Sequence, residues 1–182
     1  MDAPADQPDR TVETFDHAAE ADLAPRLLVC LHAQEWVDAV LTRRPYREVA
    51  VLEVAATAAA HALSDEGLGE ALAAHPRIGE RPTDAAASSA HSRREQAGVG
   101  TDDSTAQRLR EANLDYEARF GQVLLVRAAG RSAEDVLALT TERLGNDEAT
   151  EQRVVREQLG EIAVLRLRSL LDELAATTRT GA

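Results

Sequence analysis

The sequence is poor in cysteine and in aromatic residues. Its 182 residues include a single cysteine, Cys30, and aromatic side chains make up only 3% of the chain. One cysteine excludes an internal disulfide and a metal site built from several cysteines. With so few aromatic rings, aliphatic side chains must fill the core. The abundance of Ala, Leu, Glu and Arg favours helices over sheets.

Positive charge and long hydrophobic runs are also scarce. Lys and Arg number 20 against 32 Asp and Glu, which gives a formal net charge of −12. This excess argues against nucleic acid or an anionic membrane as a partner. No apolar run reaches the length of a membrane span, and the polar first residues are unlike a signal peptide. We therefore expect a cytoplasmic protein, in which a site for an anion must be a local positive spot.

Helical periodicity covers most of the chain and predicts an all-α fold. We expect a disordered tail over residues 1–12 and one compact multi-helix domain over residues 13–178, ending in a long helix. The first predicted helix begins near Asp22 with Pro25 in its first turn, and the second carries Trp36 and stops near Arg44. A third spans 48–63, and a fourth follows a Ser64 cap and continues to Leu72. The remaining predicted helices are one that starts near Ser92, one over 104–119, one from Ser132 to Leu144 and one over 148–177. Residues 122–129 are apolar but too few to classify.

Residues 73–90 have no helical periodicity, and their prolines and glycine predict a loop. Long loops of this kind inside compact domains are often functional. His75 stands at its start, just before Pro76. Imidazole titrates near neutral pH and can pass a proton, although a lone histidine is more often an ordinary loop residue. His17, His32 and His61 lie in helical stretches without polar companions.

Arg166 is the most informative single residue in the last predicted helix. At about 100° per residue it falls on the same face as the apolar positions Val155, Leu159, Ile162 and Leu170, whereas Arg168 points to the solvent side. An unpaired buried charge is very costly, so the Arg166 guanidinium must meet an anion. That anion is either a carboxylate from another helix or a carboxylate of a ligand, which suits the planar fork.

The segment that begins at Ser92 allows two compatible interpretations. Ser92 and Glu95 have the spacing of a capping box, which needs no further function. A helix start also presents free backbone N–H groups to small anions, and Gln96 adds an amide suited to a urea group.

A separate hypothesis is a metal site of two histidines and a carboxylate, formed by His75, His91 and Glu95.

Several ordered motifs together resemble the 2-oxo-4-hydroxy-4-carboxy-5-ureidoimidazoline (OHCU) decarboxylase family. They are His75-Pro-Arg-Ile-Gly-Glu80, Ser92-x-x-Glu-Gln-Ala-Gly98, Asn113-Leu-Asp-Tyr116-x-x-Arg-Phe-Gly121, the apolar residues 123–129 with Gly130-Arg131, and Glu161-Ile-Ala-x-Leu-Arg166-Leu, preceded by Trp36 and Arg44-Pro45-Tyr46. The resemblance extends over about residues 14–175.

This resemblance implies an all-helical, cofactor-free enzyme, usually a homodimer, at the last step of urate oxidation to allantoin. The substrate would be OHCU and the product (S)-allantoin, with no metal involved. His75 and Glu95 would form the catalytic pair, with His75 as the family's catalytic histidine. The implied substrate contacts are Pro76, Ser92, Arg93, Arg94, Glu95, Gln96, Arg166 and the segment Leu124, Leu125, Val126, Arg127 and Ala128, which would act through its backbone.

The chain departs from the family pattern in one segment. Gln122-Val123-Leu124 replaces a Phe-Pro-Phe-like stretch, and Arg127 stands where small residues are common.

Two other functions are compatible with the residues alone. A metal-dependent hydrolase or lyase would use His75, His91 and Glu95 and bind a metal ion. A non-catalytic helical interaction module would bind no ligand at the His75 loop.

Overall fold

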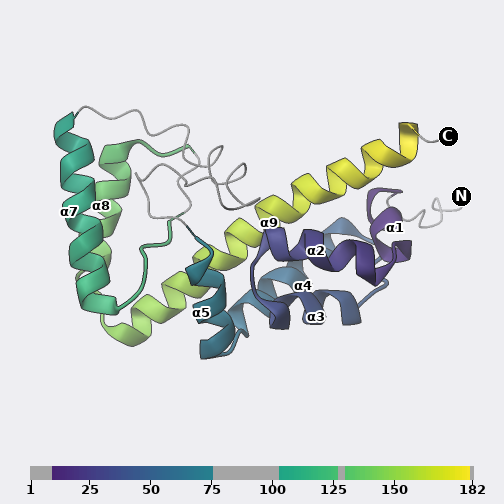
Figure 1. Cartoon of the computed structure of the whole chain (residues 1–182), viewed down its shortest axis with the longest axis horizontal. Helices are drawn as coiled ribbons and strands as arrows, with labels where there is room; N and C mark the ends of the chain where they lie inside the picture. The colour runs from purple at the N-terminus through teal and green to yellow at the C-terminus, as the bar shows by residue number, and fades with distance from the viewer. Residues whose placement is uncertain (1–9, 76–102, 127–129, 181–182) are drawn as a thin grey trace, which may run out of the picture.

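The computed structural model describes residues 10–75, 103–126 and 130–180, and their regular secondary structure is entirely helical (Figure 1). The helices are α1 (Arg10–His17), α2 (Glu20–Cys30), α3 (Gln34–Thr42), α4 (Val49–His61), α5 (Asp65–Ala73), α7 (Asp103–Phe120), α8 (Ala133–Arg143) and α9 (Glu148–Thr180). The all-α prediction is confirmed, including the long final helix. No helix in these ranges is both long and apolar enough to cross a membrane.

The first two helices differ from the sequence-based prediction. α1 begins at Arg10, so residues 10–12 are helical and their assignment to a disordered tail is wrong. The physical reason is burial, because Val12 and Phe15 are fully buried in the core. α2 begins at Glu20 rather than near Asp22, which places Pro25 inside the helix and not in its first turn.

The predicted helix ends in the rest of the described chain agree with the structure. Ser64 caps α5 by accepting a hydrogen bond from the N–H of Gly67 at 3.1 Å. Ser132 and Asp135 form a reciprocal capping box at the start of α8. α7 ends at Phe120 and is followed by Gly121, whose φ of 67° is a left-handed conformation that costs glycine little. These local signals determine where α5 and α8 begin and where α7 ends.

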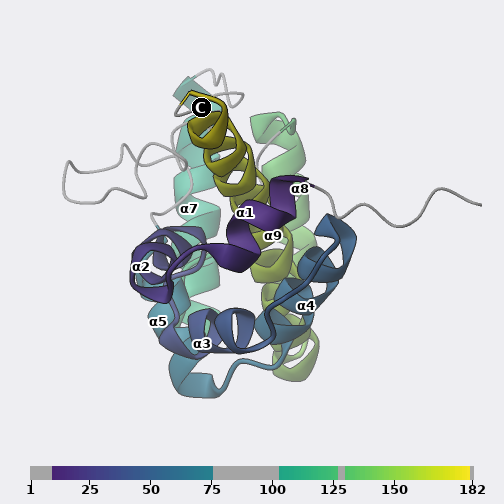
Figure 2. The ribbon, with the colours of Figure 1, turned by 90° about the vertical axis from the view of Figure 1, so that its right-hand side faces the viewer.

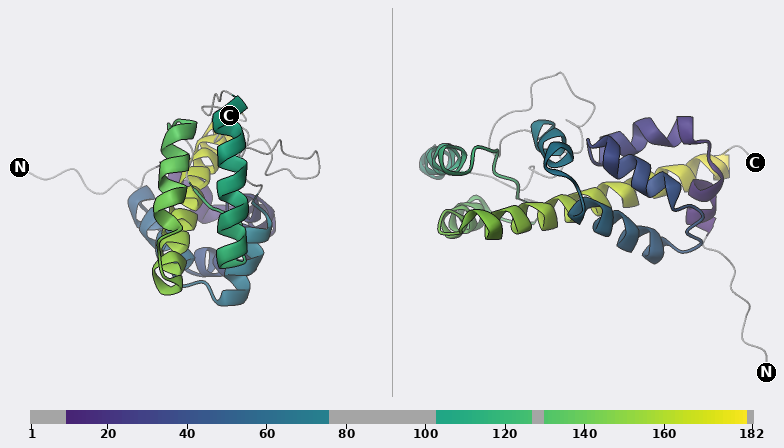
Figure 3. Two further views of the ribbon diagram at one scale, coloured as in Figure 1. Left: turned by 90° about the vertical axis from the view of Figure 1, so that its left-hand side faces the viewer. Right: turned by 90° about the horizontal axis from the view of Figure 1, so that it is seen from below.

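The long helix α9 runs through the whole molecule (Figures 1 and 3). Its 33 residues give a length of about 50 Å at 1.5 Å per residue. The helices α7 and α8 lie beside its first turns, and α1 to α4 gather around its later turns (Figures 1 and 2). α5 stands between these two groups. The middle of α9 therefore lies near the junction of the two groups.

The two helix groups have separate apolar cores. The larger core contains residues of α1 to α5 and α9, among them the fully buried Trp36, whose indole N–H donates to the Ala56 carbonyl at 2.9 Å. The smaller core contains residues of α7 and α8, with Tyr116 and Val136 fully buried. The residues that follow Gly121 connect the two cores, which places this segment at the junction.

Candidate active site

Some of the predicted site residues lie in the part of the chain that the structure describes. These are His75, Arg166 and the segment Leu124–Val126. The remaining ones fall outside the described residues: Pro76, His91, Ser92, Arg93, Arg94, Glu95, Gln96, Arg127 and Ala128. The loop and the helix predicted between residues 76 and 102 also fall outside. Their roles stay predictions.

His75 is held in a defined orientation at the end of α5. Its backbone N–H donates to the Leu72 carbonyl at 3.0 Å, and its Nδ1 lies 2.7 Å from the Ala71 carbonyl oxygen. A carbonyl can only accept, so Nδ1 carries the proton, and the neutral ring has its lone pair on Nε2. Nε2 is buried. The contact with Ala71 therefore prepares Nε2 to accept or pass a proton.

Arg166 points into the interior, as its helical position predicts. Its side chain is 4% exposed, and Nη1 donates to the Cys30 carbonyl of α2 at 3.4 Å. The apolar positions on the same face are also buried: Val155, Leu159, Ile162 and Leu170. Arg168, two residues further, has a side chain that is 58% exposed. The middle of α9 thus carries an inward guanidinium beside α2.

Cys30 does not supply the negative charge that a buried guanidinium requires. Burial raises the pKa of the Cys30 thiol to about 12, although the nearby positive charge of Arg166 acts to lower it. The thiol donates to the Arg26 carbonyl at 3.4 Å. At neutral pH the sulfur is therefore protonated and uncharged. The Cys30 backbone carbonyl contacts Arg166 as a neutral dipole.

Residues 123–126 form an extended segment whose side chains alternate between the two cores. Leu125 is buried in the larger core, with the partly buried Val123 packed against it, whereas Leu124 and Val126 are buried in the smaller core. Successive side chains of an extended chain point in opposite directions and so alternate in this way, with a period of two residues. Because both sets of side chains are used for packing, the segment can offer a ligand only its backbone.

A buried polar network holds the backbone of this segment. Arg143 Nη1 donates to the Leu125 carbonyl, while Nε donates to Glu151 at 2.9 Å and Nη2 to the hydroxyl of Tyr116 at 3.2 Å. Tyr116 donates a very short hydrogen bond to Glu151, and Asn146 Nδ2 donates to the other carboxylate oxygen at 2.8 Å. Arg143 and Glu151 are 3% and 1% exposed.

The pKa values in this network follow from its hydrogen bonds. Burial acts to raise the pKa of the Glu151 carboxyl, but hydrogen bonds from Arg143, Tyr116 and Asn146 outweigh it and hold the pKa below its usual value. Burial, together with the hydrogen bond to Glu151, raises the pKa of Tyr116 to about 12. At neutral pH the network therefore contains a charged ion pair and a neutral phenol.

Sequence reasoning did not identify Arg143 and Glu151, although one signal was present. Glu151 lies one turn before Val155 on the same inward stripe of α9 that contains Arg166. A carboxylate on an apolar stripe requires a buried partner, as Arg166 does. Gln122, where the chain departs from the family pattern, contacts this network, because its Nε2 donates to the Tyr116 hydroxyl at 3.4 Å. This side chain belongs to the edge of the network.

The end of α5 borders two hollows. One, of about 400 Å³, lies between α5, Gln152 of α9 and the residues from Phe120 to Val123. The other, of about 500 Å³, lies between α5 and residues of α2 and its end, including Leu28 and His32. Both are lined by Ala73, two residues before His75. The hollows thus flank the segment that presents the histidine.

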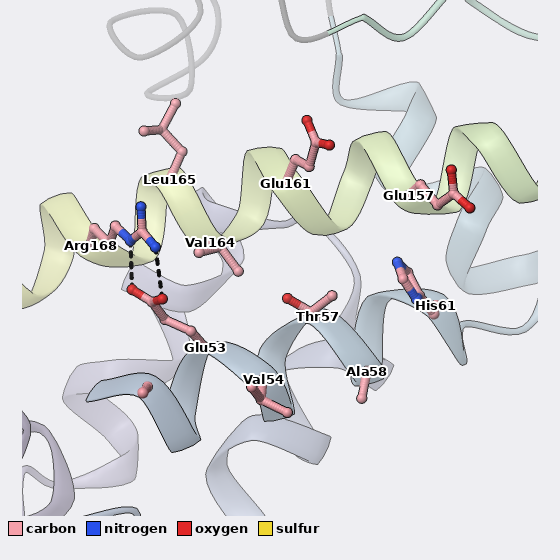
Figure 4. Close-up of a pocket in the computed structure, with 11 residues that line it drawn as sticks. Glu53, Val54, Thr57, Ala58, His61, Glu157, Glu161, Val164, Leu165 and Arg168 are labelled. Carbon is pink, nitrogen blue, oxygen red and sulfur yellow. Dashed lines mark hydrogen bonds and ion pairs between the residues drawn. The ribbon is translucent and has the colours of Figure 1, made fainter. Parts of the chain in front are cut away.

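A larger groove lies on the opposite, outer side of α9, between it and α4 (Figure 4). Its volume is about 880 Å³. The carboxylates of Glu53, Glu157 and Glu161 line it, and the guanidinium of Arg168 is engaged by both oxygens of Glu53 at 2.5 and 2.7 Å. Since its cation is already paired and its walls are acidic, this groove does not suit an anion.

No group of three His, Cys, Asp or Glu side chains within the described ranges could hold a metal ion. Two of the three residues of the metal-site hypothesis, His91 and Glu95, lie outside those ranges. The described residues instead include a histidine whose ring contacts the Ala71 carbonyl, the buried guanidinium of Arg166 and the buried segment Leu124–Val126.

Comparison with known proteins identifies the family of this chain. The family model for OHCU decarboxylase matches residues 16–168. The 2-oxo-4-hydroxy-4-carboxy-5-ureidoimidazoline decarboxylase of Amia calva is 30% identical over 144 residues, covering 78% of this chain and 82% of that protein. The uric acid degradation bifunctional protein TTL of Arabidopsis thaliana is 30% identical over 110 residues, covering 58% of this chain and 34% of that protein.

A solved structure shares the fold. It is a crystal structure of OHCU decarboxylase in the presence of (S)-allantoin, with a TM-score of 0.69, 23% identity, and coverage of 85% of this chain and 99% of the other. The family match extends over most of the sequence, and the fold and the relative agree with it. The chain therefore belongs to the OHCU decarboxylase family.

Proposed function

We propose that this chain is a cofactor-free carboxy-lyase that converts OHCU to (S)-allantoin in urate degradation. Its membership of the OHCU decarboxylase family supports the proposal. The observation that carries it in this molecule is Arg166, a guanidinium only 4% exposed in a chain of net charge −12. It is a local positive spot on an inner face, which an anionic substrate requires.

The chemistry needs no electron sink from the protein. The carboxylate of OHCU is attached one carbon from a ring C=N bond. When the bond to the carboxylate breaks, carbon dioxide leaves and the electron pair moves into the imine. The protein must orient the substrate, stabilise the developing charge and deliver a proton to one face. Delivery to one face gives the S configuration.

The residues divide these tasks between them. His75, with Nδ1 fixed on the Ala71 carbonyl, presents Nε2 to the carboxyl group and manages the proton. Arg166 meets the substrate's carboxylate or a ring oxygen. Glu95 orients the substrate or His75, and the backbone of residues 124–128 binds the ring or its ureido group. The other proposed contacts are Pro76, Ser92, Arg93, Arg94 and Gln96.

The described backbone of Leu124–Val126 supports its part in this scheme. All three residues are buried, with exposed fractions from 3% to 6%. Within the described structure, the one hydrogen bond that their backbone makes is accepted by the Leu125 carbonyl. Buried backbone N–H groups normally have partners. A ligand with carbonyl oxygens, such as an imidazoline or a urea, matches them.

We also propose a cytoplasmic homodimer that pairs through α4. Val51 and Val54 of this helix are 47% and 71% exposed. A two-fold interface brings a patch against its own copy, so an acidic face would meet like charge, whereas an apolar face meets an apolar one. The exposed valines of α4 would supply the apolar contact with a second copy, beside the acidic groove that Val54 also lines.

The test of the proposed activity is turnover of freshly generated OHCU by the purified protein without added cofactor. We expect the formation of (S)-allantoin to accelerate, and exhaustive chelation to leave the rate unchanged. Activity that disappears on chelation and returns with a divalent metal would replace the proposal with the metal-dependent alternative. Absence of acceleration would favour the non-catalytic interaction module.

A further inference from the structure

We propose that Arg143 is a positioning residue for the reaction, which it serves by fixing the carbonyl of Leu125 and so the backbone on either side of it. This inference rests on the proposed function, in which that backbone binds the substrate. Arg143 lies at the end of α8, and its side chain is 3% exposed. It acts on the substrate only through Leu125.

The guanidinium spans two parts of the molecule that are far apart in the sequence. Its Nη1 holds Leu125, 18 residues earlier, and its Nε and Nη2 hold Glu151 at the start of α9. The Leu125 side chain is buried in the larger core, whereas Arg143 belongs to the helix pair of the smaller core. The contact therefore ties the position of the extended segment to α8 and α9 together.

The remaining members of the network fix the guanidinium itself. Glu151 accepts from Arg143, from the Tyr116 hydroxyl and from Asn146 Nδ2, so its carboxylate has little freedom. The Arg143 guanidinium carbon also lies 5.4 Å from the centroid of the Tyr116 ring. A planar fork can make all these bonds at once, which a lysine ammonium cannot. The orientation of Arg143 is therefore determined on several sides.

Stability alone does not explain why this ion pair is buried. A buried ion pair is often no more stabilising than an apolar replacement of similar volume. Its geometric effect is definite, because the direction of the Leu125 carbonyl sets the adjacent peptide planes. Displacement of a binding group by about 1 Å can reduce a rate by about 10²-fold. A positioning role explains why the chain holds a peptide carbonyl with a charged group.

The experiment compares kcat and KM for OHCU in the wild type, Arg143→Lys and Tyr116→Phe, with melting temperatures measured in parallel. Arg143→Lys keeps the charge beside Glu151 but loses the fork, so we expect kcat/KM to fall about 10²-fold. Tyr116→Phe keeps the ring and removes one contact that orients Arg143, and we expect a fall of about tenfold. Arg168→Lys, in the exposed pair with Glu53, is the matched control and keeps its activity.

A purely structural role would lower the melting temperature and leave kcat and KM of the folded fraction unchanged. That result in Tyr116→Phe would overturn the inference even if Arg143→Lys did not fold. Amide hydrogen exchange gives a second readout, and we expect faster exchange at Leu124–Val126 in both variants but not in Arg168→Lys. An inactive wild type would overturn the proposed function and this inference with it. An active wild type with unaltered variants would overturn the inference alone.

Discussion

The two sides of α9 offer different kinds of space. The outer groove beside α4 has a volume of about 880 Å³ and contains a histidine, an arginine and several carboxylates. The hollows beside the end of α5 are smaller, at about 400 and 500 Å³. Yet the outer Arg168 has a side chain that is 58% exposed and pairs with Glu53, whereas the inner Arg166 is only 4% exposed and contacts the Cys30 carbonyl.

This comparison shows that charge and burial identify a site for an anion better than volume does. The outer groove has the same residue types as the inner side, with His61 and Arg168 corresponding to His75 and Arg166. On the outer side these groups are exposed, and exposed ion pairs are worth little and are screened by salt. On the inner side the protein fixes the ring of His75 and excludes water from Arg166. Paired substitutions on the two sides test this difference.

The largest effect is expected when His75 is replaced. His75→Ala should lose roughly 10²–10⁴-fold in rate, because a positioned proton-transfer group contributes about that much. The fold should persist, since His75 follows the last turn of α5. Steady-state rates with freshly generated OHCU and circular dichroism of the helices measure the two quantities.

The control for this substitution is His61→Ala in the outer groove, where we expect an unchanged rate. Equal losses in both variants would break the comparison between the two sides. A fully active His75→Ala protein would remove this residue from the mechanism. If His75→Ala unfolds, its hydrogen bond to Ala71 has a structural role instead.

The next effect concerns the two arginines. Arg166→Lys keeps the positive charge but loses the planar fork, so binding of (S)-allantoin should weaken. The loss should approach the range of about 2–5 kcal/mol seen when a buried charge-assisted contact loses one partner. Arg168→Lys should bind as the wild type does. Titration calorimetry at one salt concentration measures both, and equal affinities would place Arg166 outside the site.

A smaller effect is expected on acid stability. The folded-state pKa of Glu151 lies below its usual value, so its ion pair with Arg143 stabilises the fold above about pH 4.5. This contribution is lost as the pH falls through the lowered pKa. Each kcal/mol lost should reduce Tm by about 2–4 °C in a domain of this size. Glu151→Gln should flatten this part of the Tm-against-pH curve, and an unchanged curve would assign the acid sensitivity to other carboxylates.

The smallest effect on activity is expected at the dimer face. Val54→Asp adds a charge to the exposed face of α4, where a two-fold interface would bring it against its own copy. We expect light scattering to show a shift from dimer to monomer, with little change in turnover. Leu114→Asp is the control, since Leu114 is 62% exposed but lies on α7. A wild type that is monomeric throughout would contradict the homodimer proposal.

Much of the fold could be predicted because it depends on local signals. Ser64 and Ser132 mark helix starts by their own hydrogen bonds, and Gly121 marks a helix end by its positive φ. The inward position of Arg166 follows from helical periodicity and needs no knowledge of neighbouring helices. α1 was missed because its short apolar pattern gains stability only from distant packing of Val12 and Phe15.

The partners within the polar network could not be predicted, because its contacts join distant positions. Arg143 binds the carbonyl of Leu125 and the carboxylate of Glu151, and no spacing rule links a loop carbonyl to a helix end. The apolar segment after Gln122 was likewise unclassified, since a run of that length fits a helix or an extended chain. Its alternation becomes meaningful only when two cores lie on its two sides.

The most direct test of the central claim follows the chirality of allantoin formed from freshly generated OHCU. The sign and size of the circular dichroism signal distinguish the S enantiomer from a racemic product. We expect the wild type to give a rapid S-allantoin signal without cofactor, and His75→Ala to give the slow racemic signal of the uncatalysed reaction, with His61→Ala matching the wild type. A wild-type protein that yields only racemic allantoin at the uncatalysed rate would contradict the account.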